Sequence, residues 1–301
     1  MKRKVTFVLL LMITAATASA QLLYRISGKG LKAPSYIIGT YHLASASFAD
    51  SIPGLKAAID ASSQVCGEVD MSDMMSPDNM KRMQVAMMLP EGKTLKPLLS
   101  EDEMKRFNAV MRGLLGVDMT NASVAQQLGR LTPIALNTQF TLLMFLKKHP
   151  GFDEQNQLDG YFQKVAKEKG KTVIGLETID FQIRMLYENM NLERQKELLM
   201  CLVDNMDFNE KMVDDIVNAY KAQNIKAMQK AMDTKLHNNC DNTPEEDANL
   251  IYNRNINWYT KMPTIMQEKP TLFVVGAGHL VGGKGLLTLF KNGGYTVEGV
   301  K

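Results

Sequence analysis

Two apolar runs near opposite ends of the chain each lead into the pattern Gly-x-x-His. The first run ends at Gly39 and leads to His42, and the second ends at Gly276 and leads to His279. Short apolar runs of this kind predict buried β-strands, and a glycine at their end permits a sharp turn or a close backbone approach. In open α/β folds, functional groups follow the carboxyl ends of strands. The repeated pattern therefore predicts two histidines at the rim of a sheet.

Other apolar runs predict strands toward both ends of the chain and helices between them. The further strands are expected at residues 22–26, 64–69, 171–175 and 295–300. Gly28 and Gly30 lie between the runs at 22–26 and 35–39, which predicts a β-hairpin. Helical spacing and helix-start signals predict helices at 53–61, 100–115, 123–128, 134–148, 158–169, 179–234, 284–290 and from Thr243 onward.

The first 20 residues have the three parts of an export signal. A basic start at residues 2–4 precedes an apolar run at 5–13, and the small residues at 18–20 match an A-x-A cleavage site. The apolar run is shorter than the roughly 20 residues that a membrane-spanning helix needs. We expect cleavage after Ala20, a periplasmic or secreted protein, and no transmembrane anchor after cleavage.

Removal of this signal abolishes the net charge. The chain has 35 Lys and Arg against 32 Asp and Glu, a formal charge of +3, and the signal holds three of the basic residues and none of the acidic ones. A formally neutral domain has no electrostatic footprint for nucleic acid, so a nucleic-acid partner is not expected.

The three cysteines predict one disulfide and one free thiol. Cys201 and Cys240 both lie in the helical second half, so they are the expected pair in an oxidising compartment. Cys66 lies in a predicted buried strand, where a thiol acts as a small apolar side chain. The spacing of the three residues does not match a zinc site.

Two glutamates follow predicted strands in the same manner as the two histidines. Glu68 and Glu177 each come directly after a strand, and with His42 and His279 they predict either a divalent metal site or a metal-free acid/base pair. The structural alternative is that the histidines bond loop carbonyls and the glutamates are solvated or cap helices. His149 and His237 lie at a helix end and in a polar turn and are not expected in the site.

These motifs together resemble the TraB/GumN family, whose relatives include the TIKI proteases that act on Wnt. The resemblance extends from Leu22 to the end of the chain. It rests on the segments Ile38-Gly39-Thr40-Tyr41-His42, Glu68-Val69-Asp70, Leu158-Asp159, Gly175-Leu176-Glu177-Thr178, Arg254-Asn255, Val275-Gly276-Ala277-Gly278-His279-Leu280, Gly283, Gly285 and Gly294-Tyr295 with Val297.

The resemblance implies an α/β fold similar to that of the erythromycin-esterase and ChaN-like group. Residues 21–301 would form one domain, with a mixed β-sheet core built from the N- and C-terminal halves and a large helical middle region. It also implies metal-dependent peptide hydrolysis with Mn or Co, and His42, Glu68 and His279 as the ligands. Glu177 would orient a ligand or act as a general base.

Arg254, Asn255 and Tyr41 are expected to contact a peptide or small-molecule substrate. For Arg254, the expected role is to hold a carboxylate through a bidentate contact, and the structural alternative is a surface ion pair.

Two other functions remain open. A metal-independent, esterase-like hydrolase would use His42 as the base and Glu68 as its orienting partner. A non-catalytic protein of the same fold would bind a peptide or heme in a methionine-rich helical groove. The simpler expectation for these methionines is adaptable core filling, and they are Met80, Met83, Met87, Met88, Met104 and Met111.

Overall fold

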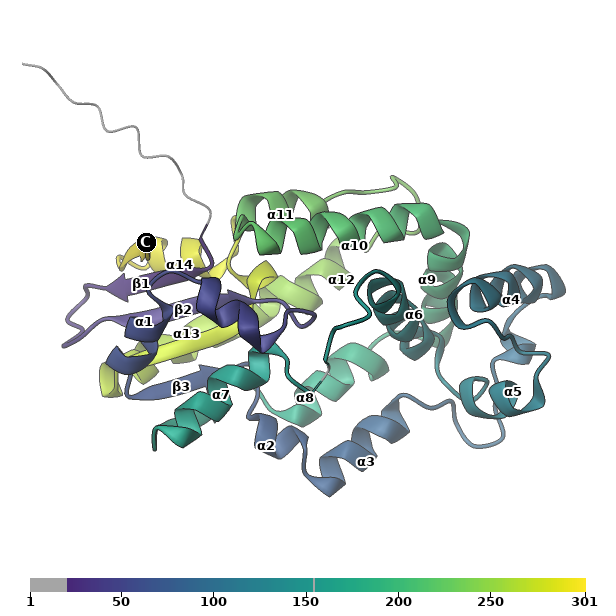
Figure 1. The fold of residues 1–301 in the computed structure, drawn as a ribbon, viewed down its shortest axis with the longest axis horizontal. Coiled ribbons are helices and arrows are strands. Elements are labelled where there is room, and N and C mark those ends of the chain that lie inside the picture. Colours follow the sequence, from purple (N-terminus) through teal and green to yellow (C-terminus); the bar gives the residue numbers. More distant parts are fainter. Residues whose placement is uncertain (1–20, 154) are drawn as a thin grey trace, which may run out of the picture.

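The computed structural model describes residues 21–153 and 155–301, and the expected export signal lies outside them. The described chain forms a sheet surrounded by helices and, beside it, a region made of helices alone (Figure 1). The predicted α/β class is confirmed. Within 21–153 and 155–301, every helix is too short or too polar to span a bilayer.

The sheet has six strands in the order β4-β3-β5-β2-β1-β6. The first four in this order are mutually parallel, and β1 pairs antiparallel with both β2 and β6. The strand from near the end of the chain, β5, therefore lies between two strands from its start, as a sheet built from both halves requires. The strands are β1 (Leu23–Ser27), β2 (Ser35–Thr40), β3 (Gln64–Gly67), β4 (Thr172–Gly175), β5 (Thr271–Gly276) and β6 (Thr296–Gly299).

The predicted hairpin is confirmed by the pairing of β1 with β2, in which Leu23 is opposite Ile38. Its turn contains Gly28 and Gly30, whose φ angles are 90° and 77°. These left-handed conformations are strained for residues with a Cβ atom, so glycine is the natural residue at both positions.

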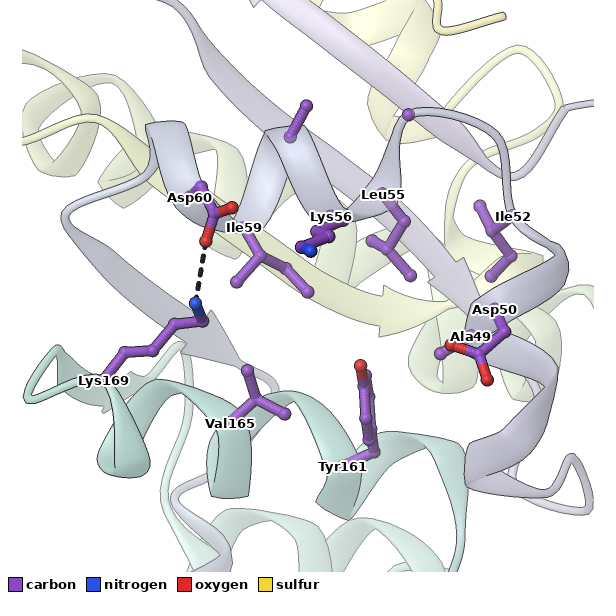
Figure 2. Close-up of a pocket in the computed structure, with 12 residues that line it drawn as sticks. Ala49, Asp50, Ile52, Leu55, Lys56, Ile59, Asp60, Tyr161, Val165 and Lys169 are labelled. Carbon is purple, nitrogen blue, oxygen red and sulfur yellow. Dashed lines mark ion pairs between the residues drawn. The ribbon is translucent and has the colours of Figure 1, made fainter.

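Helices pack against the sheet and share its core. Figure 2 shows α1 (Leu55–Ala61) and α7 (Leu158–Glu168) beside each other over the strands. The helices α13 (Asn253–Glu268) and α14 (Leu286–Asn292) pack against each other and join the same core. This core contains Trp258 and Phe273, both fully buried. Burying such aromatic side chains contributes about 2–3 kcal/mol each.

Beside the sheet, helices form a bundle with a core of its own. Phe107 and Phe140 stack at its centre with ring centroids 5.4 Å apart. The helix predicted at 100–115 begins with a capping box, in which Ser100 and Glu103 exchange side-chain and backbone hydrogen bonds. The helices of this region are α4 (Glu101–Leu115), α5 (Ala122–Leu128), α6 (Pro133–Lys148) and α9 (Leu192–Asp204). The next two helices, α10 (Met206–Lys221) and α11 (Ile225–Met232), lead back to the sheet, where Tyr220 and Met228 join the core around the strands.

Short elements connect these parts. They are the helices α2 (Met71–Met74), α3 (Pro77–Ala86), α8 (Ile179–Ile183) and α12 (Pro244–Asp247), the 3₁₀ turns η1 (Ala46–Ser51), η2 (Lys96–Leu98) and η5 (Ala277–His279), and the π-helical turns η3 (Arg184–Glu188) and η4 (Ala248–Tyr252).

The methionines divide into two groups. Met111 is fully buried in the helical core, with Met104 packed at its edge, as core filling predicts. Met80 lies on α3, a helix with no buried residue, and is 48% exposed. Met83, on the same helix, is half-buried and packs against a small cluster around Ile179, so core filling describes Met83 but not Met80.

Cys201 and Cys240 are joined by a disulfide, which ties α9 to the segment before α12. Cys66 is a free, fully buried thiol in β3, and burial raises its pKa to about 12.

Candidate active site

Each of the four parallel strands is followed by one of the side chains singled out from the sequence. His42 follows β2, Glu68 follows β3, Glu177 follows β4 and His279 follows β5. Oε1 of Glu68 accepts a hydrogen bond from the Gly276 amide at 2.8 Å and lies 4.0 Å from Nε2 of His279. The carboxyl ends of parallel strands share one edge of the sheet, so these residues gather there.

Gly39 shows why the two Gly-x-x-His motifs are so close. A Cβ atom at this position would lie 2.8 Å from Cδ1 of Leu280 and 2.9 Å from Cα of Ala277. Both distances are shorter than ordinary van der Waals contacts. The first glycine is therefore needed for the close approach of the second motif.

Arg254 lies among these side chains rather than at the surface. Its guanidinium donates to Glu68 at 2.6 Å and also to Glu177, and it lies over the Trp258 ring at 4.7 Å. Trp258 donates its indole N–H to Glu177 at 2.9 Å. The Arg254 side chain is only 5% exposed, and the two carboxylates balance its charge inside the protein.

The carboxylate of Glu68 is held in its ionised form. Burial alone would raise its pKa, but His279, Arg254, His42 and the Gly276 amide together keep the pKa of Glu68 below its usual value. Gln182, on α8, donates to Glu177 at 2.9 Å and to Glu68 at 3.4 Å and so bridges the two carboxylates.

His279 is buried and neutral. Its Nδ1 lies 2.7 Å from Oδ1 of Asn255, and its Nε2 lies 3.2 Å from the Arg254 guanidinium. A guanidinium only donates, so Nε2 is the acceptor and Nδ1 carries the proton. Burial lowers the pKa of His279 to about 4, although Glu68 opposes this change. The ring also lies 4.4 Å from that of Trp258.

His42 has the opposite character. Its side chain is 72% exposed, and its Nδ1 lies 2.8 Å from Oδ2 of Asp159, in the first turn of α7. The hydrogen bond and charge of Asp159 raise the pKa of His42 to about 9, with a smaller contribution from Glu68. The expectation that Glu68 orients His42 is therefore corrected, because Asp159 holds Nδ1 and leaves Nε2 for other contacts.

The expected metal ligands are not assembled as a metal site. Among the described residues, no three His, Cys, Asp or Glu side chains are placed to hold one ion. The Arg254 guanidinium bonds both Glu68 and His279, and His42 is bonded to Asp159. As placed, His42, Glu68 and His279 do not fit a three-ligand divalent site.

The residues expected to contact substrate have different surroundings. Asn255 is fully buried and donates to the carbonyls of His279 and Lys284, so it positions the His279 segment. Arg254 is buried among carboxylates, as described above. Tyr41 is half-buried beside the ring of Tyr220, with centroids 5.6 Å apart, and lines a pocket.

Three residues of the site have no role in the sequence analysis: Asp159, Gln182 and Trp258. Asp159 is in the first turn of a helix, where acidic residues are common for reasons of helix stability alone. Gln182 and Trp258 lie on predicted helices without a distinguishing pattern. Their contacts with His42, Glu68 and Glu177 respectively span 81 to 117 positions of sequence, which no local pattern contains.

A large cavity of the described residues lies elsewhere. A space of about 660 Å³ separates α1 from α7, with the Asp60–Lys169 ion pair at one end and Tyr161 toward the other (Figure 2). None of the candidate site residues lines it.

Fold and site together define an α/β protein whose ionisable side chains gather at the carboxyl edge of a mixed sheet. Residues 22–299 match the model of the TraB/PrgY/gumN family, and the chain belongs to that family. No solved structure is significantly similar to it.

Curated relatives include two proteins named as metalloproteases. The metalloprotease TIKI homolog of Nematostella vectensis is 23% identical over 313 residues, which cover 89% of this chain and 65% of the relative. Metalloprotease TIKI2 of Danio rerio is 23% identical over 311 residues, covering 88% and 58%. The chain thus spans about three fifths of the length of these relatives.

Proposed function

We propose that this protein is a hydrolase that cleaves peptide bonds. The observation that carries the proposal is the His42–Asp159 pair, an exposed imidazole bonded to a carboxylate at 2.8 Å, beside the Glu68–Arg254–His279 cluster. Membership of the TraB/PrgY/gumN family and similarity to proteins named as metalloproteases support the same reaction class.

In the proposed reaction, Nε2 of His42 takes a proton from the water that attacks the scissile carbonyl and gives it to the leaving amine as the C–N bond breaks. Asp159 keeps the proton on Nδ1 and stabilises the imidazolium that forms. Because Asp159 raises the pKa of His42 to about 9, the free-base form becomes more abundant as the pH rises from 7 to 9. Arg254 and Gln182 hold the Glu68 carboxylate in place beside the reacting groups.

Metal dependence, with Mn or Co as the expected ion, is a separate part of the proposal. It is supported by the names of the relatives. The described side chains do not fit such an ion as they are placed, because Arg254 bonds two of the three expected ligands. We therefore assign no step to a metal, and metal content and activity are to be measured independently.

We also propose export, with cleavage after Ala20. The basic and apolar start of the chain and the Cys201–Cys240 disulfide support it, since disulfides persist mainly in oxidising compartments. Mass spectrometry of the secreted or periplasmic protein should give Gln21 as its first residue. An intact residue 1 in the exported fraction would contradict cleavage.

The test of the hydrolase is digestion of a complex peptide mixture, with new termini identified by mass spectrometry. The wild-type protein is expected to cleave, and His42→Ala is expected to lose about 10²–10⁴-fold in rate. His237→Asn is the matched control, since position 237 has a φ of 60° that asparagine tolerates.

Two outcomes would overturn the proposal: absence of cleavage by the metal-replete wild type, or unchanged cleavage by His42→Ala. Parallel digests after chelation, with metal analysis of the protein purified without chelator, decide metal dependence independently of the peptidase proposal.

A further inference from the structure

A second cavity lies directly beside His42 and has no assigned role. We call it the Tyr41 pocket. Its volume is about 520 Å³, within the 300–1,000 Å³ range of ligand sites. It is lined by Tyr41, Leu43, Ala44, Ser45, Ser47, Phe48, Ser51, Phe145, His149, Gly151, Phe152, Val217, Tyr220 and Lys221.

The lining of the pocket adjoins the candidate active site in sequence. Tyr41 and Leu43 both line it, and His42 is the residue between them. Consecutive Cα atoms are about 3.8 Å apart, so the wall of the pocket begins one residue from His42. A peptide held at His42 would place a neighbouring side chain within reach of this cavity.

Five aromatic rings of Phe and Tyr line the pocket and pack against one another. Tyr220 lies 5.2 Å from Phe48 and 5.6 Å from Tyr41 between ring centroids, and its hydroxyl donates to the Gly39 carbonyl at 3.1 Å. The centroids of the Phe145 and Phe152 rings, which also line the pocket, lie 5.1 Å apart. An aromatic ring that binds against these side chains would form similar pairs, each worth about 0.5–1.5 kcal/mol of binding free energy beyond the burial of its surface area.

The charges of the pocket favour an uncharged apolar occupant. No Asp or Glu is among its described lining residues, and Lys221 carries the one formal charge there. Burial lowers the pKa of His149, and Lys221 adds to this change, so this ring is neutral at pH 7. A Lys or Arg side chain would find no carboxylate partner in this lining, and its desolvation would oppose binding.

We propose that the Tyr41 pocket binds an aromatic or long aliphatic side chain of the substrate, next to the peptide bond at His42. The proposal rests on the proposed peptidase function and adds the class of residue that is recognised. Tyr41, Phe48 and Tyr220 contact the side chain.

Gly151 offers a variant at the edge of the pocket. It lines the cavity, and a Cβ atom built there meets no other atom within 4 Å. Gly151→Leu is therefore chosen to obstruct the cavity, because the added side chain begins at the lining and displaces no existing atom. Gly113, in α4, is equally open and lies outside the pocket, so Gly113→Leu is the matched control.

Binding is tested first, without turnover. Saturation-transfer NMR with N-acetyl-phenylalanine amide is expected to show ring contacts in the wild type and in Gly113→Leu, with affinity at least tenfold weaker in Gly151→Leu. N-acetyl-glycine amide and N-acetyl-lysine amide are expected to show no such contacts. Equal binding of the phenylalanine probe to both variants, or no binding to the wild type, overturns the pocket assignment.

Cleavage is tested second, with peptides that differ at one position beside the scissile bond. In the wild type, Phe, Tyr, Leu or Met there is expected to raise kcat/KM at least tenfold over Gly and Lys. Gly151→Leu should remove this preference, whereas Gly113→Leu should keep it and leave kcat/KM for every peptide within twofold of the wild type. Loss of all cleavage with intact probe binding would count against the peptidase proposal alone, whereas cleavage without the preference would count against the pocket.

Discussion

At the residue scale, the site combines two histidines with opposite protonation. His42 is exposed and bonded to a carboxylate, so its pKa rises to about 9. His279 is buried beside a guanidinium, so its pKa falls to about 4. At pH 7 the first ring carries a proton that it can exchange with solvent, and the second is neutral, with its Nε2 lone pair accepting a hydrogen bond from Arg254. The two identical motifs therefore supply different chemical groups.

The first prediction concerns Asp159. Asp159→Asn removes the charge that raises the pKa of His42, so that pKa should fall from about 9 toward its usual 6.5. The rising limb of the plot of kcat/KM against pH should move to lower pH by about two units, because His42 then loses its proton at lower pH. The plateau rate should fall about 10²-fold, because the ring loses its orienting partner.

The matched control is Asp207→Asn, which changes an exposed aspartate in the first turn of α10, the same helical position that Asp159 has in α7. An Asp159→Asn profile that coincides with the wild type would show that His42 does not act through this pair.

The second prediction concerns Arg254. Arg254→Met leaves Glu68 and Glu177 without their shared cation in a buried site, which should lower the free energy of unfolding by about 3–5 kcal/mol. Urea denaturation measures this value. Arg25→Met, which breaks an exposed ion pair with Glu298, should cost no more than about 1 kcal/mol.

If unpaired charge is the cause, the double variant Arg254→Met with Glu177→Gln should recover part of the lost stability. An additive loss in the double variant would argue against this explanation.

At the element scale, the segment from α9 to α12 is held by a disulfide and by one arginine. Cys201 and Cys240 enclose 39 positions of sequence. Nearby, Arg194 donates to Glu246, Glu197 and the carbonyls of Asn239 and Asp241. Together these contacts hold the polar segment that leads into α12, η4 and then α13, which carries Arg254.

The third prediction follows from that disulfide. Replacing both cysteines by serine should lower the free energy of unfolding by about 3–4 kcal/mol, the usual cost of opening a loop of 39 residues. Denaturation of the oxidised wild type and the double variant measures it. Reductant should lower the stability of the wild type to a similar extent and leave the variant unchanged. If reductant also lowered the stability of the variant, its effect would arise outside this disulfide.

The π-helical turns are a second feature at this scale. η3 follows α8, which carries Gln182. η4 ends two residues before Arg254, and the Arg254 guanidinium donates to the carbonyl of Leu250 in η4 at 3.2 Å. π-Helical turns are rare and occur frequently at functional sites. Both of these turns adjoin the cluster around Glu68 and Glu177, which agrees with a site at this edge of the sheet.

At the scale of the whole molecule, the sheet and the helical region have separate cores. The central strands β2 and β5 are almost fully buried, whereas α3 has no buried residue. Local opening is easiest where few apolar contacts oppose it.

The fourth prediction is that hydrogen exchange follows this gradient. Backbone amides of β2 and β5 should exchange slowest, and those of α3 should exchange fastest among the longer helices, as measured by mass spectrometry. Protection of α3 equal to that of β5 would show that another contact covers this helix.

Much of the fold could be predicted because its signals are local. The runs at 35–39 and 271–276 are strands, the Gly28–Gly30 turn makes a hairpin, and Ser100 and Thr243 begin helices. Each of these depends on residues a few positions apart, where side-chain periodicity and capping chemistry act directly.

The sequence by itself also determined which side chains stand at the ends of strands: His42, Glu68, Glu177 and His279. Only the tertiary structure decided their partners. The insertion of β5 between β3 and β2 brings Gly276 to Glu68, α13 places Arg254 between two carboxylates, and α7 supplies Asp159 to His42. The physical reason is that local pattern records where a strand ends, whereas ionisation and hydrogen bonding depend on neighbours that long-range packing alone brings together.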